Sequence, residues 1–187
     1  MCLDYSLIPK PKIMKKLPLL LAAVFCLVVS CQDTQTKDEL ANFKQAETLK
    51  ATNIELAKKF YRHLDAVQLD SMKALCAPDI QIYYESGEPA SFSDMAPFIE
   101  MFYTSFPDYK HEIQDIIAEE DKVVFRISFS GTFTNSFMEM NPSGEKFRYN
   151  GVQIFQISNG KVTNLWIVED ELGLMVQLGL ELRPIVE

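Results

Sequence analysis

Residues 151–180 read GVQIFQISNGKVTNLWIVEDELGLMVQLGL, and this stretch decides the fold. Two runs rich in β-branched and aromatic residues flank Asn159-Gly160, and both turn residues tolerate the positive φ angles of a type I′ turn. The pattern therefore predicts a β-hairpin. The apolar spacing of residues 170–180 then predicts a short helix directly after the second strand.

Further strands are predicted upstream of this hairpin, with a second tight turn at Glu120-Asp121. The five strand-like runs cover residues 79–84, 109–119, 122–133, 145–158 and 161–169. Before them, apolar residues recur at steps of three and four from Asn53 to Val67, which predicts an amphipathic helix. Asp70 is the expected N-cap of a second helix and Ser93 that of a third, which ends at Phe106.

Helices followed by a long antiparallel meander indicate an α+β fold. A twisted sheet of this length must curl, and the helices must cover its concave face. We therefore expect a cone: a curved antiparallel sheet wrapped on the N-terminal helices, with a short C-terminal helix and an apolar pocket at the wide end.

The start of the chain has the pattern of an export signal. Met14 precedes Lys15-Lys16, and an apolar run of about a dozen residues follows, which is too short to span a bilayer. The sequence Val-Val-Ser before Cys31 resembles the lipobox of bacterial lipoproteins, in which the cysteine is lipidated and becomes the first residue. We expect residues 1–30 to be a signal peptide, with Met14 as the true start.

Composition narrows the function of the mature part. Removing residues 1–30 takes away four of the 18 lysines and arginines and one of the 26 acidic residues, which leaves a net charge of −11. Such a chain repels phosphate backbones, so nucleic acid is not an expected partner. Only Cys31 and Cys76 remain, so no disulfide is expected and Cys76 is interpreted as a small buried residue. No metal-ligand spacing or cofactor fingerprint occurs, so neither a metal nor a cofactor is expected.

Two stretches resemble a known family. They are residues 106–133, FPDYKHEIQDIIAEEDKVVFRISFSGTF, and the opening stretch 151–180 with its glycine, NGK turn, tryptophan, following acid and LGLMVQLG. They resemble the SnoaL-like polyketide cyclases, also called ester cyclases, of the nuclear-transport-factor-2-like superfamily. The resemblance implies a SnoaL-like domain over residues 49–187. The polar stretch before it, residues 31–48, is expected from its composition and from the lipobox to be a lipidated flexible tether. It also implies a homodimer, because open sheet faces in this family often pair.

The family's general acid/base is an aspartate near the end of the last strand. Here the matching acid is Asp170, with Glu169 as second choice. Side chains alternate along a strand, so Asp170 shares a face with Trp166, and Glu169 lies on the other face. Asp170 is favoured for that reason, although an aspartate there can equally be the N-cap of the last helix.

A histidine assists this acid in the family, but the strand 145–158 contains none. Gln153 can orient a carbonyl there but cannot shuttle a proton. Arg126 is expected either to pair with Asp115 or to bind a ligand anion. The residues expected to line or bind at the pocket are Trp166, Gln153, Arg126, His111, Tyr84, Phe102 and Tyr149.

Two functions remain open at this stage. The first is cofactor-free acid/base chemistry, as cyclase or isomerase, on a small hydrophobic molecule in the pocket. The second is a non-catalytic lipoprotein that binds such a molecule or supports an envelope assembly; the missing histidine and the export signal favour it. Either protein would be anchored in the cell envelope through Cys31. Gln32 after the cysteine favours the outer over the inner membrane.

Overall fold

The computed structural model describes residues 17–85 and 87–183, with side chains from Thr36 onward. The expected start at Met14 and the side chain of Cys31 lie outside the described part. By their contacts the residues form two units, Met1–Ala46 and Glu47–Glu187. The second unit contains the fold expected from the sequence.

Helix α1 (Leu17–Asp65) is longer than the sequence pattern suggests. The residues expected to form a flexible tether, 31–48, are helical, consistent with their content of alanine, leucine, lysine and glutamate, which favour helix. In the second unit, α1 contributes Ala57, Phe60 and Tyr61 to the core. No described helix combines the length and apolarity needed to cross a membrane.

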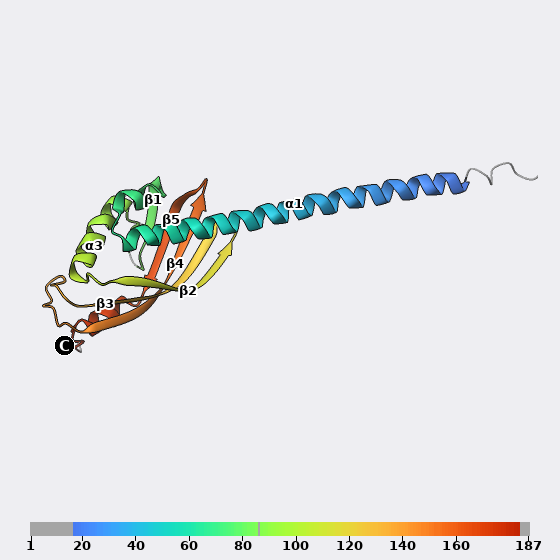
Figure 1. The fold of residues 1–187 in the computed structure, drawn as a ribbon. Coiled ribbons are helices and arrows are strands. Elements are labelled where there is room, and N and C mark those ends of the chain that lie inside the picture. Colours follow the sequence, from blue (N-terminus) through green and yellow to red (C-terminus); the bar gives the residue numbers. More distant parts are fainter. Residues whose placement is uncertain (1–16, 86, 184–187) are drawn as a thin grey trace, which may run out of the picture. The chain divides into compact units, whose positions relative to one another are not determined.

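Five strands form one curved sheet in the order β1-β5-β4-β3-β2 (Figure 1). They are β1 (Cys76–Tyr83), β2 (Lys110–Glu119), β3 (Lys122–Thr132), β4 (Lys146–Ser158) and β5 (Lys161–Glu169). Strands β2 to β5 are the predicted antiparallel meander, and β1 adds to its edge in parallel with β5. The α+β prediction is confirmed.

The two tight turns have the expected backbone. Asn159 and Gly160 both have positive φ angles, 51° and 71°, as does Glu120 at 51°. The register, however, shifts by one residue in each hairpin, at Gln114 in β2 and at Thr163 in β5. An extra residue in one strand exchanges the faces of every side chain beyond it, so these two bulges set the orientation of the site.

The inner face of the sheet is the core. Phe125, Ile127 and Phe129 of β3 are fully buried, while Arg126 between them is exposed on the outer face. Phe60 of α1 packs edge-on against Phe155 of β4, with ring centroids 5.4 Å apart. The helices therefore cover the concave side, as predicted.

Two predicted helix starts are each wrong by two residues. Helix α2 (Leu69–Lys73) has Gln68 as its N-cap, so Asp70 lies inside its first turn. Helix α3 (Phe92–Ser105) begins after Ser91 and not after Ser93. Ser91 and Asp94 form a capping box, in which the Ser91 amide donates to Asp94 Oδ2 at 2.8 Å. This reciprocal pair satisfies two otherwise unpaired amides and fixes the start.

Helix α4 (Glu171–Gln177) is tied to β4 where β5 has ended. The Gln177 amide nitrogen donates to the Arg148 carbonyl at 3.0 Å, and its oxygen accepts from the Arg148 amide at 3.0 Å. Gln177 thus replaces the missing strand partner of Arg148 and holds α4 across the end of the sheet.

Candidate functional site

A cavity of about 540 Å³ lies between the concave face of the sheet and helices α1, α3 and α4. Its walls are mostly apolar and aromatic, including Phe60, Leu64, Met95, Phe98, Ile99, Phe102, Phe137, Leu165, Ile167, Leu174 and Met175. A small set of polar side chains also faces it: Tyr84, Asp94, Tyr103, Tyr109, His111, Tyr149, Gln153, Glu169 and Glu171. An apolar cavity with a few convergent polar groups is the usual form of a small-molecule site.

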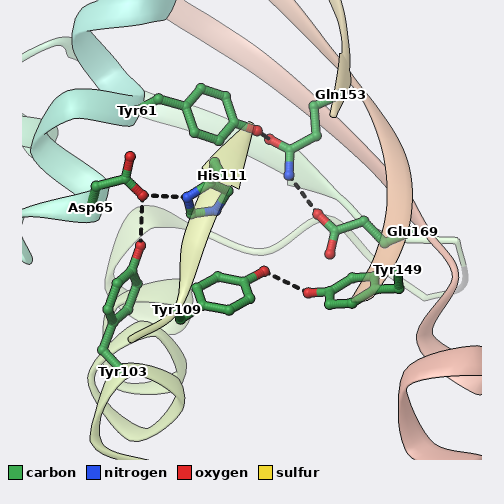
Figure 2. Close-up of polar contacts among 8 residues, drawn as sticks. All are labelled: Tyr61, Asp65, Tyr103, Tyr109, His111, Tyr149, Gln153 and Glu169. Carbon is green, nitrogen blue, oxygen red and sulfur yellow. Dashed lines mark hydrogen bonds and ion pairs between the residues drawn. The ribbon is translucent and has the colours of Figure 1, made fainter. Parts of the chain in front are cut away.

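Among the acids that line the cavity, Glu169 is the one that Gln153 holds in place (Figure 2). The Gln153 amide nitrogen donates to Glu169 Oε1 at 2.6 Å, and its oxygen accepts from the Tyr61 hydroxyl at 2.5 Å. Gln153 and Tyr61 are both buried. A chain of two hydrogen bonds therefore runs from α1 through β4 to the carboxyl group on β5.

Gly151 makes room for this arrangement. It is the cross-strand neighbour of Glu169, and a Cβ atom at this position would lie 2.6 Å from Glu169 Cγ and 2.8 Å from the Val168 carbonyl oxygen. Any side chain here would push Glu169 aside, so the glycine noted in the sequence has a steric role beneath the carboxylate.

Burial in this apolar surrounding raises the pKa of Glu169 from its ordinary value of 4.5 to about 7. This pKa already includes a smaller upward contribution from the negative charge of Glu171 and the opposing effect of hydrogen bonds from Gln153 and Tyr149, which favour the ionised form. A carboxyl group with this pKa is roughly half ionised at neutral pH, so it can both take up and return a proton.

Tyrosine hydroxyls form a second polar group beside Glu169. The hydroxyl oxygens of Tyr109 and Tyr149 are 2.5 Å apart and both residues are buried. Burial, reinforced by neighbouring tyrosines and carboxylates, raises the pKa values of Tyr61, Tyr109 and Tyr149 above the ordinary value of 10. These tyrosines therefore stay protonated and act as neutral donors at physiological pH.

His111 belongs to a third polar group, which includes Asp65 at the end of α1 (Figure 2). The Nδ1 atom of His111 is hydrogen-bonded to Asp65 Oδ1, and the Tyr103 hydroxyl donates to the same oxygen at 3.1 Å. Only 4% of the His111 side chain is exposed, and its ring packs edge-on against Tyr61 and Tyr109. The imidazole is thus fixed in orientation.

Asp170 lies outside the cavity. It is exposed, and its Oδ1 accepts from the Gly173 amide at 2.9 Å as the N-cap of α4. The carboxylate is committed to the helix start, which is the alternative left open for this residue. The geometry therefore favours Glu169 over Asp170 as the cavity acid, which reverses the order expected from the sequence.

Two other residues expected in the pocket are also elsewhere. Trp166 stacks on Tyr83, with centroids 5.3 Å apart, on the opposite side of the sheet. Arg126 is exposed on that outer side, and although Asp115 is its cross-strand neighbour, the described residues show no ion pair between them. The remaining five expected residues line the cavity: Gln153, His111, Tyr84, Phe102 and Tyr149.

Sequence reasoning missed Asp65, Tyr109 and the polar role of Tyr61. One signal existed for the first: Asp65 follows Tyr61 by four residues, so both lie on the same face of α1. No sequence pattern links Tyr109 to Tyr149, because the two hydroxyls meet only through the curvature of the folded sheet.

Within the described residues no three histidine, cysteine or acidic side chains gather as a metal site would require. Cys76 is buried, and burial raises the pKa of its thiol to about 12, so it stays protonated, in line with its predicted packing role.

The fold and the sequence both match known proteins. Residues 55–178 match the family model of the SnoaL-like polyketide cyclases. AclR from Streptomyces galilaeus, a proposed hydroxylase, is 30% identical with a TM-score of 0.66 over 73% of this chain and 87% of its own. TsrD from Streptomyces laurentii is 25% identical with a TM-score of 0.61, over 70% of this chain and 96% of its own.

The proposed polyketide cyclase IdmH from Streptomyces antibioticus shares the fold at 23% identity. Its TM-score is 0.62, over 68% of this chain and 99% of its own. No curated protein sequence is significantly similar to the chain. The chain belongs to the SnoaL-like polyketide cyclase family.

The raised pKa of Glu169 gives a testable link between pH and stability. Between pH 4.5 and 7 the folded protein keeps a proton that the unfolded chain releases, so the free energy of unfolding should fall as pH rises through this window. A shift of this size corresponds to a loss of ~3 kcal/mol. Glu169→Gln should remove this loss in urea unfolding measured from pH 4.5 to 8, and should be the more stable protein at pH 8.

Glu139→Gln is the matched control, because Glu139 is exposed. Its stability curve should run parallel to that of the wild type. Parallel curves for Glu169→Gln and wild type across the same pH range would contradict the assignment.

Proposed function

We propose that the domain binds a small hydrophobic carbonyl compound in its cavity and that Glu169 acts as a general base in cofactor-free cyclase or isomerase chemistry. The observation that carries the proposal is a carboxyl group with a pKa of about 7, set in an apolar cavity and oriented by Gln153. Family membership supports the small-molecule part of the proposal, and the aromatic walls suit a flat ligand.

The chemical step is a proton transfer. The ionised Glu169 takes a proton from the carbon next to the ligand carbonyl, and the electron pair of the broken C–H bond moves into an enolate. Tyr149 donates to the ionised Glu169, and one hydroxyl proton is shared between Tyr109 and Tyr149. Once Glu169 has taken up the proton it no longer needs this donor, so a tyrosine hydroxyl can hydrogen-bond the developing oxyanion instead. Return of the proton to another atom isomerises the ligand, and attack of the enolate on a second carbonyl closes a ring.

Deuterium exchange into 2-tetralone, a flat enolisable ketone, tests this step. In D₂O the wild type should speed exchange of the protons next to the carbonyl, followed by proton NMR, and the rate should rise with pH around 7. Glu169→Gln should lose at least ~100-fold of this rate, the usual contribution of a general base.

Asp170→Asn is the matched control, because asparagine also serves as an N-cap. It should keep the exchange rate within about twofold, since a cap residue contributes no base. Loss of exchange in Asp170→Asn, with an unchanged rate in Glu169→Gln, would make Asp170 the base and overturn the proposal. Binding of 2-tetralone without any enhanced exchange would favour the alternative, a non-catalytic binding lipoprotein.

We further propose that the domain works in the bacterial envelope, anchored through lipidated Cys31. The support is the signal-like sequence ending at Val-Val-Ser before this cysteine. One acyl chain anchors a protein only marginally, whereas the several chains of a bacterial lipoprotein anchor it stably. The residue after the cysteine, Gln32, favours the outer membrane in a cell that has one.

Cys31→Ser tests the anchor. The variant should lose labelling with a palmitate analogue and leave the membrane fraction when the full precursor is expressed. Cys26→Ser changes a cysteine inside the apolar run and should behave as the wild type does. Unchanged labelling of Cys31→Ser would contradict the lipid anchor.

A homodimer through the outer face of the sheet is also proposed, in line with the pairing of open sheets in this family. Ile117, Val152 and Val168 are exposed there by 63%, 37% and 50%. Val168→Lys should convert the wild-type dimer to a monomer in sedimentation, because burial of a lysine opposes association. Leu182→Lys, a control outside the sheet, should not. A monomeric wild type would contradict the proposal.

A further inference from the structure

His111 forms an acid–base centre of its own in the cavity, separate from Glu169. The two residues come from different strands, β2 and β5, and both line the same cavity. Tyr61 and Gln153 serve Glu169, whereas Asp65 and Tyr103 serve His111 (Figure 2). Among the described side chains no hydrogen bond joins these two sets, so each centre has its own support.

The state of the imidazole follows from its partner. Asp65 Oδ1 already accepts the Tyr103 proton, and a carboxylate oxygen only accepts, so Nδ1 of His111 carries the proton of this contact. In a neutral ring the other nitrogen, Nε2, then holds a lone pair. Asp65 thereby selects the tautomer in which Nε2 is a proton acceptor.

Nε2 is open to a ligand. Nε2 has no hydrogen-bond partner among the described residues. Every fully buried polar side-chain atom of these residues does have a partner, so Nε2 is not fully buried and a ligand can reach it. The two nitrogens of an imidazole point in widely different directions. Because Nδ1 faces Asp65 at the end of α1, Nε2 faces away from it, on the side where His111 lines the cavity with Tyr109.

We propose that His111 Nε2 accepts the hydrogen of a ligand's acidic hydroxyl group, so that the natural ligand is a phenol or an enol that also carries the carbonyl group. This inference rests on the proposed function and specifies its ligand. The transfer breaks the O–H bond and forms an Nε2–H bond, and the electron pair stays on the oxygen. Asp65 stabilises the resulting imidazolium, so it is a positioning residue and His111 is the catalytic one.

The aromatic surroundings suit this ligand class. Tyr61, Tyr109 and Phe129 surround the imidazole with ring centroids 4.9, 5.0 and 5.2 Å away. Flat rings can pack beside such side chains while their hydroxyl meets Nε2. A hydroxyl on an aromatic ring or an enol is also a stronger hydrogen-bond donor than one on a saturated chain, so it suits an imidazole nitrogen that accepts.

A pair of probes tests the acceptor directly. 2-Naphthol carries an acidic hydroxyl, and 2-methoxynaphthalene has the same flat body without a proton to donate. The wild type should bind 2-naphthol at least about tenfold more tightly in fluorescence titrations, a typical effect of one good hydrogen bond. His111→Phe should reduce this ratio to within about twofold of one, because phenylalanine keeps a flat ring but accepts no proton.

His63→Phe is the matched control. His63 is the only other histidine of the chain, and its Nδ1 pairs with Gln68 at 2.8 Å on the surface. Its ratio should equal that of the wild type. A wild-type ratio near one overturns the proposal. A ratio lost in Glu169→Gln but kept in His111→Phe also overturns it, because the hydroxyl then meets Glu169, and the proposed function survives. If neither probe binds, both proposals fail.

The tautomer of His111 can be measured directly, and it would not depend on Asp65 if Asp65 only stabilised the fold. With ¹⁵N-labelled histidine the chain has only two rings, and the His63 variant assigns them. His111 should show a protonated Nδ1 and a bare Nε2 in the free protein. Asp65→Ala should shift protons to Nε2 and lower the probe ratio, whereas Tyr103→Phe should leave the tautomer unchanged. A protonated Nε2 in the neutral wild-type ring overturns the proposal.

Discussion

One extra residue in β5, Thr163, determines which acid faces the cavity. From the Asn159-Gly160 turn to Val162 the two hairpin strands pair without a gap, and beyond Thr163 the register is shifted by one. Successive side chains of a strand point to opposite faces, so this shift turns Glu169 inward and Trp166 outward. Asp170, the next residue, then falls outside, where the start of α4 uses its carboxylate. The cavity's chemistry thus depends on a local irregularity of the sheet, as is common for bulges near functional sites.

The same arrangement sets a conflict between stability and reactivity. An ionised carboxylate in an apolar cavity opposes folding, and its pKa of about 7 expresses that opposition. The hydrogen bond from Gln153, which Tyr61 holds from a different element, reduces the effect without cancelling it, because burial is the larger influence. The core around the cavity is dense in aromatic rings, with Phe125, Phe129 and Phe155 fully buried. Such a core can tolerate one unfavourable group, which is how many active sites keep a perturbed acid.

Periodicity and turn chemistry were sufficient to predict the elements, their order and the concave pocket, because these depend on apolar spacing and on residues such as Asn159 and Gly160. They were not sufficient to orient the site. If the side chains of β5 alternated without a break from the turn onward, Trp166 would lie opposite Gln153 on the inner face. Asp170, four residues later, would then lie on the inner face as well. The bulge residues Thr163 and Gln114 have no sequence signature, so the reversal is invisible before the strands are paired. Helix starts failed for a related reason, since several serines and aspartates near α3 could all cap it and only Ser91 has its partner Asp94 in place.

The missing histidine of β4 also has a different meaning in three dimensions. On that strand Gln153 supports the acid but moves no proton, which by itself suggests a binder and not an enzyme. The chain nevertheless brings a histidine to the cavity from the edge strand β2, with its own carboxylate from α1. Because Asp65 is 40% exposed, it stays solvated while it holds a nearly buried imidazole, so this support requires no buried ion pair. Whether the cavity can transfer protons therefore depends on the side chains that line it together. For the histidine, the tautomer that Asp65 selects matters more than the strand that carries it.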